Sequence, residues 1–121
     1  MSTEKYVLGG EDGHTSISES DFAKWGEWFE AGDRIVKKTK IGKLDVSTVF
    51  LGIDHNFFRT GPPLLFETMV FVGDYDSVDD IQERCATWDE AEKQHERIVE
   101  EVKNLRIPYL LTASGGRLLK T

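Results

Sequence analysis

The chain has 121 residues, with 22 acidic and 15 basic side chains and a formal net charge of −7. This length favours one domain, and a single cysteine excludes an intramolecular disulfide and a cysteine-rich zinc site. No apolar run approaches the roughly 20 residues of a membrane span, and no signal-peptide pattern follows Met1. Because an acidic surface repels phosphates, we expect neither membrane insertion nor non-specific binding of nucleic acid.

The first third of the chain predicts a short strand, a loop and a helix. Residues 6–8 have the composition of a strand, and residues 9–20 that of a loop rich in glycine. Ser18 or Ser20 is expected to cap the helix that follows. Three aromatic residues recur at steps of three and four, which predicts a helix over about residues 20–31: Phe22, Trp25 and Phe29.

The middle of the chain predicts three strands. Residues 34–41 are basic and rich in β-branched side chains, whereas residues 44–54 and 64–72 are largely apolar, as in strands covered on both sides. A long loop with two adjacent prolines, residues 55–63, separates the two apolar strands. Residues 74–86 are predicted to be an acidic linker.

A long helix is predicted near the C-terminal end. Thr87 and Glu90 have the spacing of a capping box, in which each side chain accepts a backbone amide of the other residue. The apolar stripe of this helix extends over about five turns: Trp88, Ala91, His95, Ile98, Val102 and Leu105.

These elements predict an α+β fold, in which a small antiparallel sheet of three to five strands packs against two helices in the order β-α-β-β-β-α. We expect residues 1–121 to form one domain. Residues 1–19 would be an N-terminal strand and loop, residues 20–105 the core, and residues 106–121 an edge strand or a tail.

Four residues of the types that bind metals or transfer protons lie in or beside these elements: Asp54, His55, Glu67 and His95. If residues 54 and 64 pair across the hairpin, Glu67 lies opposite Leu51. Glu67 is then roughly 13 Å from His55, because each strand residue advances about 3.3 Å. This distance favours the alternative in which Glu67 and His95 form a buried polar pair between strand and helix.

Charge is distributed unevenly along the chain. Residues 34–43 contain five basic side chains, whereas residues 74–101 contain eleven acidic side chains and three basic ones. The basic segment suits an anionic ligand or the acidic helix of a second copy, or it simply protects an edge strand from aggregation. Phe57, Phe58 and Arg59 have the composition of a binding hot spot, although both rings could instead pack against the sheet.

Four segments together resemble a family of short, uncharacterised proteins of bacteriophages and prophages. The segments are residues 25–30 (WGxWFE), 46–55 (VSTVFLGIDH), 63–71 (PLLFETMVF) and 86–95 (ATWDEAExxH). The resemblance covers about residues 20–103. It implies a phage setting and no agreed activity, and no catalytic role is transferred from it.

The predicted function is therefore that of a phage-type accessory binding protein in the cytoplasm of the bacterial host. It would capture a small anionic, nucleotide-like signal or a host defence factor, without a catalytic residue or cofactor. A metal-assisted hydrolase or transferase that uses Asp54, His55, Glu67 and His95 is one alternative, and a small virion or assembly protein is another. The charge asymmetry also suits a homo-oligomer. The expected ligand contacts are Arg34, Lys37, Lys38, His55, Phe58 and Arg59.

Overall fold

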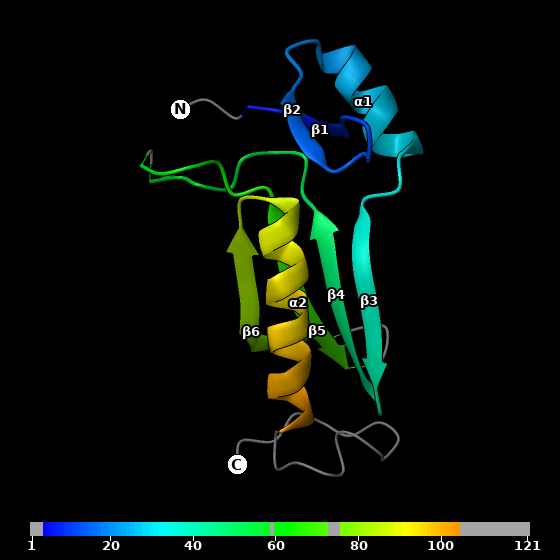
Figure 1. Cartoon of the computed structure of the whole chain (residues 1–121), viewed down its shortest axis with the longest axis vertical. Helices are drawn as coiled ribbons and strands as arrows, with labels where there is room; N and C mark the ends of the chain where they lie inside the picture. Colours follow the sequence, from blue (N-terminus) through cyan, green and yellow to red (C-terminus); the bar gives the residue numbers. More distant parts are fainter. Residues whose placement is uncertain (1–3, 59, 73–75, 105–121) are drawn as a thin grey trace.

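A computed structural model describes residues 4–58, 60–72 and 76–104, with the backbone alone for residues 76–80. The described residues form two helices and two antiparallel sheets, in the order β1-β2-α1-β3-β4-β5-β6-α2 (Figure 1). The predicted α+β fold, with a small antiparallel sheet packed against helices, is confirmed. The strand or tail predicted over residues 106–121 lies outside the described residues.

The larger sheet has four strands, and one helix lies across one of its faces (Figure 1). Its spatial order is β3, β4, β5 and β6, which span Ile35–Ile41, Leu44–Phe50, Phe66–Val72 and Asp76–Cys85. The helix α2 (Trp88–Lys103) contacts all four strands. Because side chains alternate along a strand, every second residue of β4 is buried on this face: Leu44, Val46, Thr48 and Phe50.

A smaller unit, built from β1, β2 and α1, lies beyond one end of the four-stranded sheet (Figure 1). β1 (Tyr6–Gly9) pairs with β2 (Thr15–Ser18), and α1 (Phe22–Ala31) packs against β1. The indole Nε1 of Trp25 in α1 donates hydrogen bonds to the carbonyl oxygens of Tyr6 and Gly52, at 3.1 and 3.2 Å. This side chain therefore joins the smaller unit to the segment that follows β4.

Two segments predicted to be irregular are strands. Residues 74–86, predicted to be an acidic linker, include β6, and residues 9–20, predicted to be a loop, include β2. Both strands are too polar to show an apolar strand pattern, and pairing with β5 and β1 supplies their backbone hydrogen bonds. The described residues thus contain two strands more than the predicted order.

The register between β4 and β5 also differs from the prediction. Glu67 pairs with Val49 rather than with Leu51. β4 ends at Phe50, four residues before the predicted end of the strand. Gly52 follows with φ of 78°, a left-handed conformation that ends an extended strand and favours glycine.

Both helices begin at a side-chain cap. The hydroxyl of Thr87 accepts the Glu90 amide at 3.2 Å, and the Glu90 carboxylate accepts the Thr87 amide at 3.1 Å, so the predicted capping box is confirmed. α1 is capped by Asp21, which accepts two amides of the first turn, rather than by the predicted Ser18 or Ser20. Neither described helix is long and apolar enough to cross a lipid bilayer.

We predict that Gly52→Ala destabilises the fold more than Gly13→Ala. Both glycines have positive φ, 78° and 74°, so alanine at either position is strained by roughly 1–2 kcal/mol. A Cβ at Gly52 would also lie 3.0 Å from the ring of Phe29, whereas a Cβ at Gly13 meets nothing within 4 Å. Overpacking typically adds about 1–3 kcal/mol. Urea denaturation should therefore show the larger loss for Gly52→Ala, and equal losses would contradict this account of the junction.

Candidate functional site

The basic residues predicted to contact an anionic ligand do not converge. Lys37 and Lys38 are neighbours on β3 and point to opposite faces of the sheet. Lys37 forms an ion pair with Glu96 of α2, and Lys38 is exposed to solvent. The guanidinium group of Arg34 lies over the ring of Phe29 in α1, 3.8 Å from its centroid.

The other predicted contacts lie in the loop between β4 and β5. This loop is on the β6 side of the molecule, whereas β3 forms the opposite edge of the sheet (Figure 1). His55 is held by a 2.8 Å hydrogen bond between its Nδ1 and the carbonyl oxygen of Ile53, and Phe58 is 86% exposed. Arg59 lies outside the described residues. The structure thus separates His55 and Phe58 from the basic residues on and before β3.

The four residues of the alternative metal or acid–base site are also separated. Glu67 points away from α2, and its carboxylate accepts hydrogen bonds from Arg84 at 2.9 Å and Gln82 at 2.6 Å. His95 belongs to α2, which covers the opposite face of the sheet, and its side chain is fully buried there. The predicted pair between Glu67 and His95 therefore does not form. Among the described residues, no three His, Cys, Asp or Glu side chains are placed to hold a metal ion.

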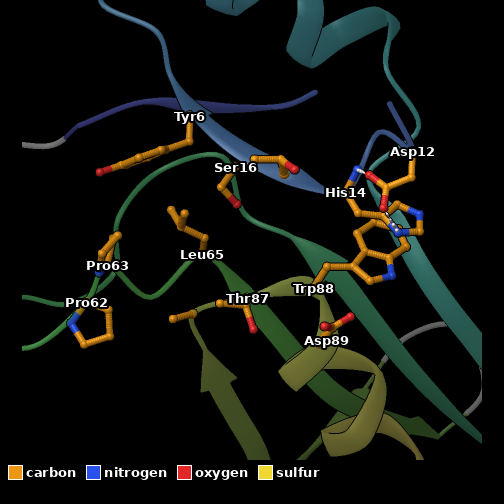
Figure 2. Close-up of a pocket in the computed structure, with 12 residues that line it drawn as sticks. Tyr6, Asp12, His14, Ser16, Pro62, Pro63, Leu65, Thr87, Trp88 and Asp89 are labelled. Carbon is orange, nitrogen blue, oxygen red and sulfur yellow. Dashed lines mark hydrogen bonds and ion pairs between the residues drawn. The ribbon is translucent and has the colours of Figure 1, made fainter. Parts of the chain in front are cut away.

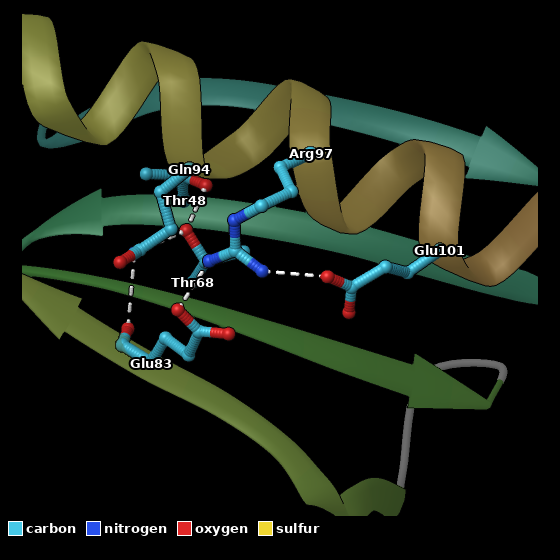
Figure 3. A network of polar contacts seen from close by, with 6 residues as sticks. All are labelled: Thr48, Thr68, Glu83, Gln94, Arg97 and Glu101. Atoms are coloured by element: carbon cyan, nitrogen blue, oxygen red, sulfur yellow. Dashed lines mark hydrogen bonds and ion pairs between the residues drawn. The ribbon is translucent and has the colours of Figure 1, made fainter.

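His95 instead belongs to a polar network between α2 and the sheet, in which His95, Thr48 and Thr68 are fully buried. Its Nδ1 lies 2.7 Å from the hydroxyl of Thr48, and its Nε2 lies 2.8 Å from the hydroxyl of Thr39. The Thr48 hydroxyl lies 2.6 Å from that of Thr68. Gln94, the preceding residue of α2, donates to the Thr68 hydroxyl at 2.9 Å and to the Glu83 carbonyl at 3.1 Å (Figure 3).

The number of hydrogen-bond donors in this network favours a neutral His95. Gln94 donates to Thr68, which can donate to Thr48, which can donate to Nδ1, while Nε2–H donates to Thr39. A second ring proton would reverse this chain and leave one buried hydroxyl proton without an acceptor. Burial lowers the pKa of His95, while the facing charges of Glu96 and Lys37 raise and lower it respectively.

A groove of about 480 Å³ lies at the N-terminus of α2, and we call it the α2 groove (Figure 2). Three separate parts of the chain line it: the β1–β2 hairpin, the end of the loop before β5, and the first turn of α2. Its apolar and aromatic surface comes from seven residues: Tyr6, His14, Pro62, Pro63, Leu65, Ala86 and Trp88.

The wall of the groove is a stacked pair of rings. The rings of His14 and Trp88 are nearly parallel, at 6°, with centroids 3.6 Å apart (Figure 2). The other side of Trp88 makes an edge contact with the buried ring of Phe66, with centroids 6.2 Å apart. The indole Nε1 of Trp88 is buried and has no hydrogen-bond partner among the described residues. Stacking on Trp88 therefore anchors the surface ring of His14 to the core.

The charge of the groove is acidic. Asp12 and Asp89 line it, and no lysine or arginine does so among the described residues. Asp12 Oδ2 lies 3.6 Å from His14 Nδ1. The N-terminus of α2 does not change this balance, because Thr87 and Glu90 already occupy amides of its first turn. The groove thus attracts cations and repels phosphates.

Cys85 lies just before the groove and is not a nucleophile at neutral pH. Burial, together with the nearby carboxylates of Glu90 and Glu83, raises the pKa of the Cys85 thiol to about 11. His14 has a carboxylate neighbour, but among the described residues no serine or threonine hydroxyl donates to its ring. Among the described residues, neither Cys85 nor His14 therefore has the surroundings of an activated nucleophile and base.

Sequence reasoning did not identify the groove residues as a site. His14 lies in a segment predicted to be a loop, and its position depends on the unpredicted strand β2. Trp88 was assigned to the buried stripe of the helix, although it is the first helical residue and half-buried. The position of Trp88 in the first turn of the helix is the one sequence signal that its side chain could line a surface groove as well as pack against the core.

We predict that the stability of the wild-type protein depends on pH through His95. The unfolded histidine binds a proton near its ordinary pKa of about 6.5, and the folded one only at lower pH. The free energy of unfolding is therefore highest above this pH. Below it, stability falls by up to about 1.4 kcal/mol per pH unit because the unfolded state binds more protons. Urea denaturation between pH 5.5 and 7.5 should show a weaker pH dependence for His95→Gln than for the wild type.

Ile98→Val is the matched control, because Ile98 is also fully buried on α2 but does not titrate. It should lower stability by about 0.5–1.5 kcal/mol at every pH and leave the pH dependence unchanged. An equal pH dependence in the wild type and His95→Gln would contradict the assignment of a neutral, buried His95.

Comparison with known proteins adds no functional assignment. No protein family, curated protein or solved structure matches this chain. What the chain can bind is therefore inferred from the contacts and charges of its own residues.

Proposed function

We propose that this chain is a non-catalytic binding protein that engages a polypeptide partner through the α2 groove. The single observation that carries the proposal is the composition of the groove. The stacked rings of His14 and Trp88 lie beside two carboxylates, Asp12 and Asp89, and no basic residue balances them among the described lining residues. Such a surface suits an aromatic side chain next to a cation, a combination that polypeptides supply.

The energetics fit a polypeptide segment better than a phosphate. Burying one aromatic side chain removes roughly 150–250 Å² from water, which is worth several kcal/mol before the costs of association. An arginine or lysine beside it would pair with Asp12 or Asp89. A phosphate in the same place would meet two carboxylates at short range and no compensating cation from the described lining.

The composition of the groove supports one of the two ligand classes predicted from the sequence more than the other. The predicted site for a small anionic ligand includes three basic residues, Arg34, Lys37 and Lys38. In the structure these residues lie on separate faces or are already paired. The host factor, as a polypeptide, matches the chemistry of the groove. The phage-type setting in the bacterial cytoplasm is supported by the resemblance of the four sequence segments, and it makes a host defence factor the proposed class of partner.

We predict that a blocked tetrapeptide, Gly-Phe-Arg-Gly, binds in the α2 groove and that Gly-Phe-Glu-Gly binds at least about fivefold more weakly, because one ion pair is replaced by repulsion. Titration followed by NMR should shift the indole N–H signal of Trp88, which Trp88→Phe identifies by its loss. The double variant Asp12→Asn/Asp89→Asn should bind the arginine peptide about fivefold more weakly.

Glu92→Gln is the matched control, since Glu92 is an exposed acid of α2 outside the groove. It should leave the affinity for the arginine peptide unchanged. Equal affinities for the two peptides, or shifts confined to the signals of β3, would overturn the proposed function.

A further inference from the structure

We propose that a second copy of this chain is one polypeptide that occupies the α2 groove. In this arrangement the loop of residues 54–63, which we call the Phe58 loop, inserts Phe58 into the groove of the other copy, and the exchange is reciprocal. The inference rests on the proposed function, because it assigns an occupant to the same groove. Four observations support it: the rigidity of the loop, the exposure of its tip, its chemistry and its position.

The Phe58 loop is held in shape by its own side chains. Asp54 Oδ1 accepts the amides of Asn56 at 2.7 Å and Leu64 at 2.9 Å, which closes the base of the loop. Asn56 Nδ2 donates to the carbonyl oxygens of Thr60 at 2.6 Å and Pro62 at 2.9 Å, across its interior. A loop ordered before binding loses little conformational entropy when it binds.

This ordered loop presents two aromatic rings to water. Phe57 is 53% exposed and Phe58 is 86% exposed, the highest value among the large exposed hydrophobic residues described. By comparison, Phe22 is 68% exposed but contacts the ring of Trp25 and lies beneath the Lys5 ammonium group. An aromatic ring held in water by a preorganised loop has the properties of an interface hot spot.

The chemistry of the loop tip complements that of the groove. In the sequence, the basic residue Arg59 directly follows the aromatic residue Phe58. The groove offers the stacked His14–Trp88 wall and the carboxylates of Asp12 and Asp89. In the proposed dimer, the ring of Phe58 would contact the rings of His14 and Trp88, and the guanidinium of Arg59 would pair with the carboxylates. The same carboxylates repel anionic partners.

The loop and the groove are also placed for a reciprocal exchange. Pro62 and Pro63, at the end of the Phe58 loop, line the groove of their own chain (Figure 2), so the loop ends at the groove. In one copy Phe58 remains exposed and does not fill its own groove. A two-fold axis beside the loop lets each copy insert its Phe58 into the other, which is how a self-complementary patch forms a closed dimer.

The expected dimer is weak, because the exchange buries two short loops rather than a broad surface. Sedimentation velocity on the full chain, from about 5 to 500 µM, should show the apparent mass rising with concentration. Phe58→Ser should reduce the association constant at least about tenfold, since a buried aromatic hot spot is worth 1.4 kcal/mol or more. Asp12→Asn/Asp89→Asn should reduce it about fivefold.

Phe22→Ser is the matched control, because it removes another exposed phenylalanine that belongs neither to the Phe58 loop nor to the lining of the groove. It should dimerise like the wild type. Circular dichroism confirms that each variant is folded before its mass is compared. A wild type that stays monomeric at 500 µM, or a dimer that persists in Phe58→Ser, would overturn the inference.

A peptide with the sequence of residues 54–64 separates this inference from the proposed function. Its binding to the groove, followed by the Trp88 indole signal, together with a monomeric full chain would overturn self-association and leave the proposed function standing. No binding of this peptide or of the arginine tetrapeptide, together with a monomeric chain, would overturn both. Binding of the peptide to a chain that dimerises through Phe58 supports both.

Discussion

Two consecutive residues of α2 fix its position on the sheet through buried and partly buried hydrogen bonds to all four strands. His95 reaches Thr39 of β3 and Thr48 of β4, while Gln94 reaches Thr68 of β5 and the Glu83 carbonyl of β6. Apolar packing alone would allow α2 to slide or rotate by a fraction of a turn, because burial of apolar area is not directional. Hydrogen bonds are directional, and a shift would leave several buried polar groups without partners. The network therefore sets where the helix begins as well as how it packs.

The start of α2 is the part of the helix on which the proposed function depends. With Gln94 and His95 fixed, the first turn of α2 extends past the sheet to the β1–β2 hairpin, where Trp88 stacks on His14. The capping box at Thr87 and Glu90 occupies two amides at the start of that turn, and the carboxylate of Asp89 lines the groove beside it. The groove that results is aromatic and acidic, although it lies at a helix N-terminus, which in other proteins often binds phosphate.

Periodicity identified most of the fold. The stripe from Trp88 to Val102 and the capping box at Thr87 predicted α2, and the apolar runs predicted β4 and β5. β2 and β6 were missed because strands with polar side chains have no apolar pattern, and their pairing partners are set by tertiary structure. The apolar pattern of β5 also does not show which of its faces packs against α2. Phe66 and Val70 lie on one face, Met69 and Phe71 lie on the other, and both sets are apolar.

The candidate site was less predictable for a related reason. His95 was correctly assigned to the buried stripe of the helix, but its hydrogen-bond partners are threonines, which carry no sequence signal of their own. Glu67 was paired with the wrong face of the sheet, and Arg84 rather than His95 partners it. The groove depends on His14 and Trp88, 74 residues apart in the sequence by their numbers, and only the folded chain brings them into contact.

The net charge of −7 is thus distributed unevenly over the folded chain. The basic side chains of β3 are divided between its two faces, and Lys37 forms an ion pair with Glu96, whereas the carboxylates of Asp12 and Asp89 both line an aromatic groove. The acidic groove, rather than the basic strand, is the surface on which the account depends.

Isotope-filtered NMR on the full chain with the unlabelled Gly-Phe-Arg-Gly peptide tests this claim most directly, because it reports which protein protons lie within about 5 Å of the bound phenylalanine. If the α2 groove is the binding site, we expect intermolecular contacts from that ring to the rings of His14 and Trp88. Contacts to Lys37 and Lys38 of β3, with none to His14 or Trp88, would contradict it.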